Sequence, residues 1–114
     1  MAQTLSETYA DFAAGFAGSA IPAEVREAAR WHIIDSIGVS IAGANPKEES
    51  GKAAAKLVKE WGGPEGASLL GLNAKARPEL AALLNGSLGQ ALEMDDKHGE
   101  SLARPGSTVI PAVL

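Results

Sequence analysis

The segment "IPAEVREAARWHIIDSIGVSIAGAN" (residues 21–45) decides the fold class. Pro22 suits the first turn of a helix, because the N–H that proline lacks would have no partner there. The apolar residues that recur at every fourth position are Val25, Ala29, Ile33, Ile37 and Ile41. Such spacing is typical of one face of a helix. Residues 33–44 are almost entirely apolar or small, so we expect other helices to surround that half.

Two shorter helices are predicted on either side of this long one. Residues 4–18 offer Thr4 or Ser6 as an N-cap and carry apolar side chains at three- and four-residue spacings. Residues 46–63 carry a narrower apolar stripe among lysines and glutamates. That pattern is typical of a helix on the outside of a bundle.

A second largely apolar helix is predicted over residues 78–94. Gly86 and Gly89 lie inside it, where each costs about 1 kcal/mol against alanine. We therefore expect a neighbouring backbone to approach closely at these two positions. The preceding residues 62–78 are rich in glycine and proline, which predicts an extended connector with at most one short strand.

Residues 106–114 open a further apolar helix that has no polar end. This favours the start of a longer protein, or a piece that needs a partner. The fold expected for residues 1–114 is a single, partial all-α domain, a helical bundle with one short extended connector.

The composition fits such a domain and argues against several functions. Apolar residues make up 46% of the chain and charged residues 21%, which is enough to form a core. The net charge of -4, without a basic cluster, gives no site for nucleic acid. The chain has no cysteine and no stretch long enough to cross a bilayer, and its start does not match a signal peptide. We therefore expect a soluble cytoplasmic protein that binds neither nucleic acid nor membrane.

The stretch "GQALEMDDKHGESLARPGS" (residues 89–107) gathers the side chains best suited to chemistry. If the helix continues into it, Gln90, Glu93 and Lys97 share one face. The first amides of the next helix are then free to hold an anion. Carboxylates beside a histidine can transfer protons, and arginine or lysine can bind a substrate carboxylate. A solvated helix end explains the same charges, and spacing alone slightly favours it over a site.

Other polar residues give weaker functional hypotheses. A metal site within residues 95–98 matches no established ligand spacing, so we do not expect a metal. His32 is interpreted as a packed or half-exposed histidine rather than a ligand. Asp35 and Ser36 interrupt the apolar half of the long helix, where a buried hydrogen-bonded pair is favoured over a functional role.

Three stretches, in this order, resemble the N-terminal part of the MmgE/PrpD family. They are "IIDSIGVSIAGA" (33–44), "NGSLGQALEMDDKH" (85–98) and "RPGSTVIPAVL" (104–114). The family pattern is an aspartate-serine/threonine-x-glycine helix, then an asparagine-glycine helix that runs into an acidic "DFDD" element followed by a histidine. "HPG" or "HPS" then opens the next helix. The resemblance covers nearly the whole chain from Ile21 onward.

The resemblance implies a helical domain that contains the active site, a second α+β domain that is absent here, and usually a homodimer. The family includes 2-methylcitrate dehydratases, cis-aconitate decarboxylases and iminodisuccinate epimerases. Their shared chemistry begins with proton removal next to a carboxylate of a small di- or tricarboxylate, and no metal or organic cofactor is implied. The sequence resembles only the opening part of such enzymes, so we do not expect the 114-residue chain to be active alone.

The resemblance implies the following roles for individual residues of this sequence. The residues predicted to shape the proton-transfer region are Glu93, Asp96 and His98. The residues predicted to hold substrate carboxylates are Gln90, Lys97 and Arg104. Arg104 replaces the family's histidine before proline-glycine, and arginine does not release its proton in a protein, so it can bind a carboxylate but cannot be the base.

Two hypotheses about function follow. The first is a lyase or isomerase, dehydratase-like in its chemistry, that acts on a small polycarboxylate and forms a dimer or joins the missing remainder of the enzyme. The second is a non-catalytic helical oligomerisation or partner-binding module, or an inactive truncated family member.

Overall fold

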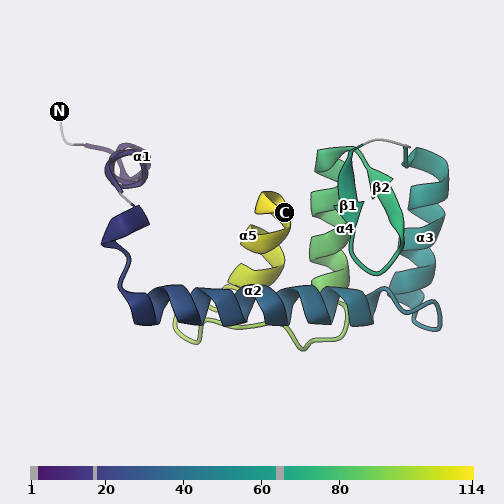
Figure 1. Cartoon of the computed structure of the whole chain (residues 1–114). Coiled ribbons are helices and arrows are strands. Elements are labelled where there is room, and N and C mark those ends of the chain that lie inside the picture. The colour runs from purple at the N-terminus through teal and green to yellow at the C-terminus, as the bar shows by residue number, and fades with distance from the viewer. Residues whose placement is uncertain (1–2, 17, 64–65) are drawn as a thin grey trace.

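The computed structural model describes residues 3–16, 18–63 and 66–114, and of residue 19 the backbone alone. The elements in these ranges are α1 (Leu5–Gly15), the 3-10 helix η1 (Gly18–Ala20), α2 (Ala23–Gly43), α3 (Glu49–Trp61), β1 (Ala67–Leu69), β2 (Ala74–Ala76), α4 (Pro78–Gln90) and α5 (Pro105–Val113). Helices α3, α4 and α5 rise from one side of α2, and α1 stands at the opposite end (Figure 1). The predicted all-α class is confirmed, with a short hairpin where an extended connector was predicted.

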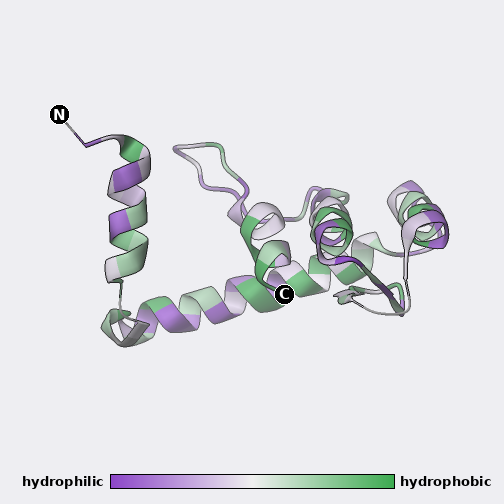
Figure 2. Cartoon of the chain, turned by 90° about the horizontal axis from the view of Figure 1, so that it is seen from above, coloured by the Kyte–Doolittle hydropathy of each residue, from purple (hydrophilic) through white to green (hydrophobic). Residues whose placement is uncertain are grey.

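The core lies between α3, α4, the hairpin and the end of α2. Its buried residues are Ala44, Ala54, Leu69, Ala76, Leu80, Ala81, Leu84 and Leu88. Figure 2 looks nearly along α3 and α4 and shows the hairpin beside them. Half of these residues are alanine and the other half are leucine, so the core depends on close helix packing rather than on aromatic bulk.

Helix α2 packs through small residues rather than through its apolar stripe. Its buried residues are Ser36, Val39, Ser40 and Gly43. Val25, Ile33 and Ile41 of the predicted stripe are 51%, 39% and 49% exposed. The prediction that helices surround this half is wrong for this chain, because its neighbours all rise from one side (Figure 1). Asp35 is exposed, so the predicted buried pair with Ser36 is not formed.

Two small residues of α2 let α4 approach closely. A Cβ at Gly43 would collide with the carbonyl oxygen of Leu88. Further along α4, a Cβ at Gly89 would lie 3.0 Å from the Ser40 hydroxyl. That hydroxyl in turn donates to the carbonyl of Ser36 at 2.8 Å. The neighbour of Gly89 is therefore a side chain, whereas a backbone was predicted.

The closest approach of α5 to Gly86 of α4 is made by backbone. A Cβ at Gly86 would lie 2.6 Å from the carbonyl oxygen of Ser107, which confirms the predicted close approach at this glycine. Pro111 stands inside α5, four residues after Ser107. Because proline has no N–H, the Ser107 carbonyl lacks the donor that an uninterrupted helix would supply. That carbonyl faces Gly86 of α4 instead.

Asn85 of α4 fixes the hairpin. Strands β1 and β2 pair antiparallel, and their turn uses left-handed backbone at Gly71 (φ 75°) and Asn73 (φ 46°). The Asn85 side chain accepts a hydrogen bond from Leu70 N at 2.9 Å and donates to Ser68 O at 3.1 Å. Since Asn85 is only 2% exposed, these bonds satisfy a buried amide.

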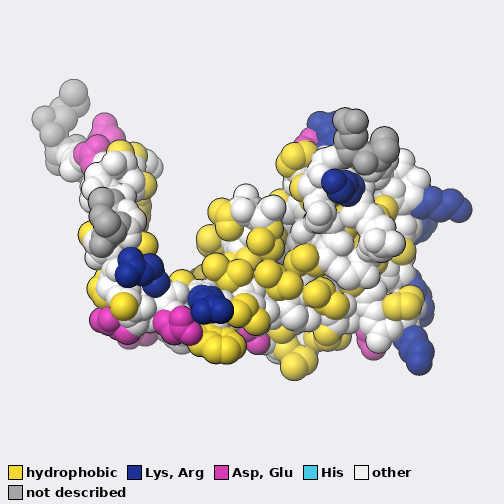
Figure 3. All heavy atoms as spheres, in the orientation of Figure 1, with side chains coloured by type: hydrophobic (Ala, Val, Ile, Leu, Met, Phe, Trp, Pro, Cys, Tyr) yellow, Lys and Arg dark blue, Asp and Glu magenta, His cyan; other side chains and the backbone are white. Residues whose placement is uncertain are grey.

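Helix α1 is well capped but buries no residue. Thr4 is the N-cap and forms a capping box with Glu7. Its apolar face stays open, since Leu5 and Tyr9 are 77% and 70% exposed. Val113 of α5 is likewise 74% exposed. Figure 3 shows hydrophobic side chains gathered over α5 and the adjoining part of α2.

Candidate active site

The candidate site begins where α4 ends. The helix stops at Gln90 rather than at the predicted residue 94. Glu93 then adopts a left-handed φ of 55°, which costs a side-chain-bearing residue about 1–2 kcal/mol and turns the chain off the helix axis. The helical face predicted for Gln90, Glu93 and Lys97 is therefore wrong. Gln90 Nε2 nevertheless donates to Glu93 Oε1 at 2.8 Å.

Arg104 joins two carboxylates of this loop. Its Nη1 donates to Asp95 Oδ1 at 2.5 Å, and its Nη2 donates to Glu93 Oε2 at 2.8 Å. The Asp95 side chain is 2% exposed, against 67% for that of Glu93. Ser107 Oγ donates to the second Asp95 oxygen at 3.1 Å. The hydrogen bond to Asp95 is the main cause that raises the pKa of Arg104 above its ordinary value, so this side chain stays charged.

Asp96 is held at the N-terminus of α5. Gly106 N donates to Asp96 Oδ1 at 2.7 Å, where the helix dipole also favours a negative charge. Asp96 Oδ2 lies 3.6 Å from Nδ1 of His32 on α2. The prediction that the first amides of this helix are free to hold an anion is wrong at Gly106, because the chain's own carboxylate occupies that N–H.

His98 is oriented by Ser101. The Ser101 backbone N–H donates to His98 Nδ1 at 3.3 Å, and the Ser101 hydroxyl lies 2.9 Å from the same nitrogen. His98 N donates to Ala103 O at 2.9 Å. Since a backbone N–H can only donate, Nδ1 is the acceptor, and the neutral ring carries its proton on Nε2.

Asp96, Lys97 and His98 line one cavity of about 590 Å³. The other lining residues come from α2 and α5 and are Ala29, His32, Ile33, Pro105, Gly106, Val109, Ile110 and Val113. The structure therefore brings together three of the six predicted site residues. The other three form the neighbouring network around Arg104, outside this lining.

His32, which was interpreted from the sequence as a packed or half-exposed histidine rather than a ligand, also lines this cavity. Its side chain is 61% exposed and faces Asp96. Ser36, four positions later and so on the same face of α2, lies beside Gly106, whose Cβ position would be 3.2 Å from the Ser36 hydroxyl. The four-residue spacing of His32 and Ser36 was the only sequence feature that could have pointed to His32 as a site residue. It becomes informative only once α5 is known to cross α2 at this point.

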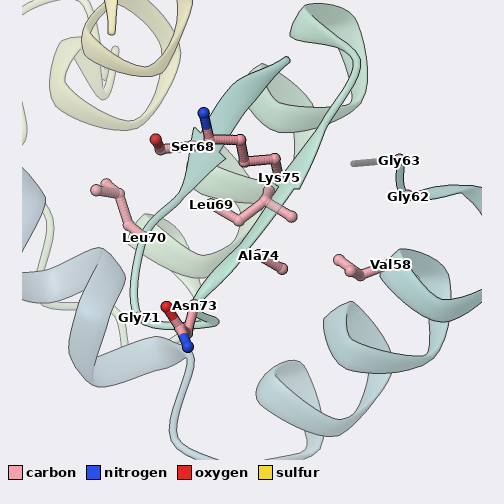
Figure 4. A pocket seen from close by; sticks show the side chains of 10 residues that line it. All are labelled: Val58, Gly62, Gly63, Ser68, Leu69, Leu70, Gly71, Asn73, Ala74 and Lys75. Carbon is pink, nitrogen blue, oxygen red and sulfur yellow. The ribbon is translucent and has the colours of Figure 1, made fainter. Parts of the chain in front are cut away.

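A larger hollow, of about 1010 Å³, lies beside the hairpin (Figure 4). It is lined by both strands, their turn and the end of α3, including Val58, Leu69 and Asn73. Lys75 is the one ionisable side chain among its described lining residues. The cavity beside α5 has four ionisable lining residues, His32, Asp96, Lys97 and His98, and is therefore the better candidate for acid–base chemistry.

Two further results concern only the part of the chain that the structure describes. No group of three or more histidine or acidic side chains there could hold a metal ion, including at Asp95, Asp96 and His98. No helix there is both long and apolar enough to cross a membrane.

The helical scaffold presents a carboxylate, two histidines and a lysine at one cavity, and these are side-chain types that can take part in acid–base chemistry. Comparison gives the particular family. Residues 7–114 match the MmgE/PrpD N-terminal domain, and the chain belongs to the MmgE/PrpD family.

Two fungal relatives show how much of such a protein is present. The cis-aconitate decarboxylase-like protein oryM of Aspergillus oryzae is 37% identical over 97 residues, which cover 83% of this chain and 19% of that protein. The cis-aconitate decarboxylase of Aspergillus terreus is 34% identical over 103 residues, which cover 90% of this chain and 20% of that protein. The chain thus spans about a fifth of the length of these relatives. No solved structure matches it.

Proposed function

We propose that this chain is the N-terminal part of a cytoplasmic lyase or isomerase that removes a proton next to a carboxylate of a small di- or tricarboxylate. The observation that carries the proposal is the meeting of Asp96, Lys97 and His98 at one cavity beside the N-terminus of α5. The names of the two relatives make cis-aconitate the first compound to test. No metal or organic cofactor is part of the proposal.

Glu93, Asp96 and His98 shape the proton-transfer region in this proposal. Asp96 has one oxygen fixed by Gly106 N, so its direction relative to the cavity is set. His98 carries the proton of its neutral ring on Nε2 and can donate it to a group on the substrate that becomes basic during the reaction. Glu93 helps to shape this region because its left-handed backbone turns the chain from α4 into the loop that carries Asp96 and His98.

Lys97, Arg104 and Gln90 hold substrate carboxylates in this proposal. Lys97 lines the cavity and is exposed, so its ammonium group is accessible to an anion. Arg104 uses two of its five N–H groups on Glu93 and Asp95, which leaves others for a carboxylate. Gln90 adjoins the same network through Glu93.

The test uses the protein encoded by the complete reading frame that contains this chain. Proton NMR in D₂O would follow cis-aconitate and 2-methylcitrate for exchange of C–H next to a carboxylate and for product formation. His98→Ala should lower the rate by roughly 100-fold or more. Arg104→Ala should weaken substrate binding. Lys75→Ala, at the other hollow, is the matched control. Unchanged rates in both the His98 and Arg104 variants would refute the site.

The apolar face of α1 supports a second candidate function, the binding of another polypeptide or a second copy. Leu5, Tyr9 and Phe12 are each at least 65% exposed, on a helix that buries nothing. Exposed apolar patches of this kind are typical of association surfaces. Light scattering on the 114-residue chain would test it, because a strict monomer at high concentration contradicts self-association.

A further inference from the structure

His32 contributes to the same cavity from a different element than the predicted residues. It lies in α2, whereas Asp96, Lys97 and His98 lie in the loop that follows α4. Its ring is largely exposed, with Nδ1 3.6 Å from Asp96 Oδ2. That distance allows an ion pair when the imidazole is charged.

The position of the Asp96 carboxylate determines which nitrogen of the His32 ring is left to face a substrate. Its Oδ1 accepts the hydrogen bond from Gly106 N, so Oδ2 is the oxygen left to face the imidazole. At 3.6 Å this oxygen is too far for a hydrogen bond, but its negative charge favours the tautomer with the proton on Nδ1, which leaves the lone pair of a neutral ring on Nε2. His98 has the opposite arrangement, because the Ser101 N–H occupies its Nδ1.

We propose that His32 is a further catalytic residue, the base that accepts the substrate proton on Nε2, with Asp96 as its positioning partner. This inference rests on the proposed function. The substrate C–H bond next to a carboxylate breaks, a new N–H bond forms on His32, and the electron pair stays on the substrate carbon, delocalised into the adjacent carboxylate. Asp96 then faces the imidazolium as its counter-charge.

The division of roles follows from the donor and acceptor directions of the two rings. Arg104 cannot serve as the base, because it keeps its proton. His98 accepts the Ser101 N–H on Nδ1, so it offers an N–H that suits the acid. His32 faces a carboxylate whose charge favours a proton on Nδ1, so it suits the base. The lining residues of α5 carry no ionisable side chain, so Asp96, Lys97 and His98 are the charged or titratable groups that share the cavity lining with His32.

Kinetics of His32 variants of the complete protein test the assignment. His32→Ala should lower kcat by about 100- to 10,000-fold while KM changes little, and added imidazole should restore part of the rate. His32→Gln should lose the same activity without rescue, because it fills the space. Arg30→Ala, an exposed position on the same helix, is the matched control and should keep full activity. Far-UV circular dichroism would verify that each variant folds.

The outcomes separate this inference from the proposed function. If the wild type is active and His98→Ala is impaired, but His32→Ala keeps its kcat or is not rescued, the His32 assignment fails and the proposed function stands. If the wild type catalyses neither exchange nor product formation with any polycarboxylate, the proposed function fails and the His32 assignment fails with it.

Discussion

Arg104 and Asp95 close the loop between α4 and α5 on itself. Arg104 Nη1 lies 2.5 Å from Asp95 Oδ1, although nine positions separate the two residues in the chain. The pair holds Asp95 almost fully buried, while the next residue, Asp96, faces the cavity. The ion pair thus holds the loop beside Asp96, whose own carboxylate is fixed by the hydrogen bond from Gly106 N.

Removing the arginine should destabilise the chain. Arg104→Gln leaves the buried Asp95 charge with only the Ser107 hydroxyl, so we expect Tm to fall by roughly 5–10 °C. Adding Asp95→Asn should recover part of the loss, because no uncompensated charge remains. Arg77→Gln, whose partner Glu79 is largely exposed like Arg77 itself, should leave Tm nearly unchanged. Thermal unfolding followed by circular dichroism measures all three, and equal losses for the two arginines would contradict the argument.

The hairpin should depend on one amide. Asn85→Ala removes the partners of Leu70 N and Ser68 O, so the free energy of unfolding should fall by about 1–3 kcal/mol in urea titrations. Amide hydrogen exchange at Leu70 should accelerate. Ser87→Ala, on the exposed side of the same helix, is the control and should have little effect. Unchanged exchange at Leu70 in the Asn85 variant would show that the hairpin is held in another way.

Two glycines of α2 should respond to alanine in opposite directions. Gly38 has no atom within 4 Å of a Cβ, so Gly38→Ala should raise the free energy of unfolding by about 0.5–1 kcal/mol. Gly43→Ala would press into the Leu88 backbone and should lower it by about 1–3 kcal/mol. Urea unfolding of both variants measures the two changes in the free energy of unfolding. A stabilising Gly43 variant would mean that α2 and α4 do not cross as closely as described.

The start of α1 should be sensitive to acid. The hydrogen bond from the Thr4 backbone lowers the pKa of Glu7 below its ordinary value of 4.5. A lowered folded-state pKa contributes stability above the unfolded value, and this is lost as pH falls through the folded one. Helix-specific chemical shifts of residues 5–8 should therefore fade as pH drops below about 4.5. Glu7→Gln should remove that pH dependence, and a persistent titration in this variant would assign it to another group.

Sequence predicts the helices well where the signal is local. Thr4 caps α1 through its own side chain, and Pro78 begins α4, as expected from the requirements of a first helical turn. The close approach of a backbone to Gly86 was also predictable. Glycine destabilises a helix interior relative to alanine, so its presence there indicates that a neighbour leaves no room for a Cβ. These features depend on a few neighbouring residues, which a single sequence displays directly.

The remaining features depend on contacts between distant segments. The buried face of α2 is set by where α4 and α5 cross it, so its serines are covered while Ile33 stays partly open. Strand β2 (Ala74–Ala76) has too few residues to show a pattern without its partner. At the site, Asp96 takes the Gly106 N–H and meets His32, a juxtaposition that spacing along one chain does not reveal.

The backbone contact between Gly86 and Ser107 bears on how this family can diversify. This contact involves no side chain of residues 91–104, although Asp95 and Asp96 of that loop add their own hydrogen bonds to Ser107 and Gly106. Even an insertion that doubled the loop would add only about 0.6 kcal/mol to its closure entropy. The side chains of this loop can therefore change while the backbone contact between α4 and α5 is kept.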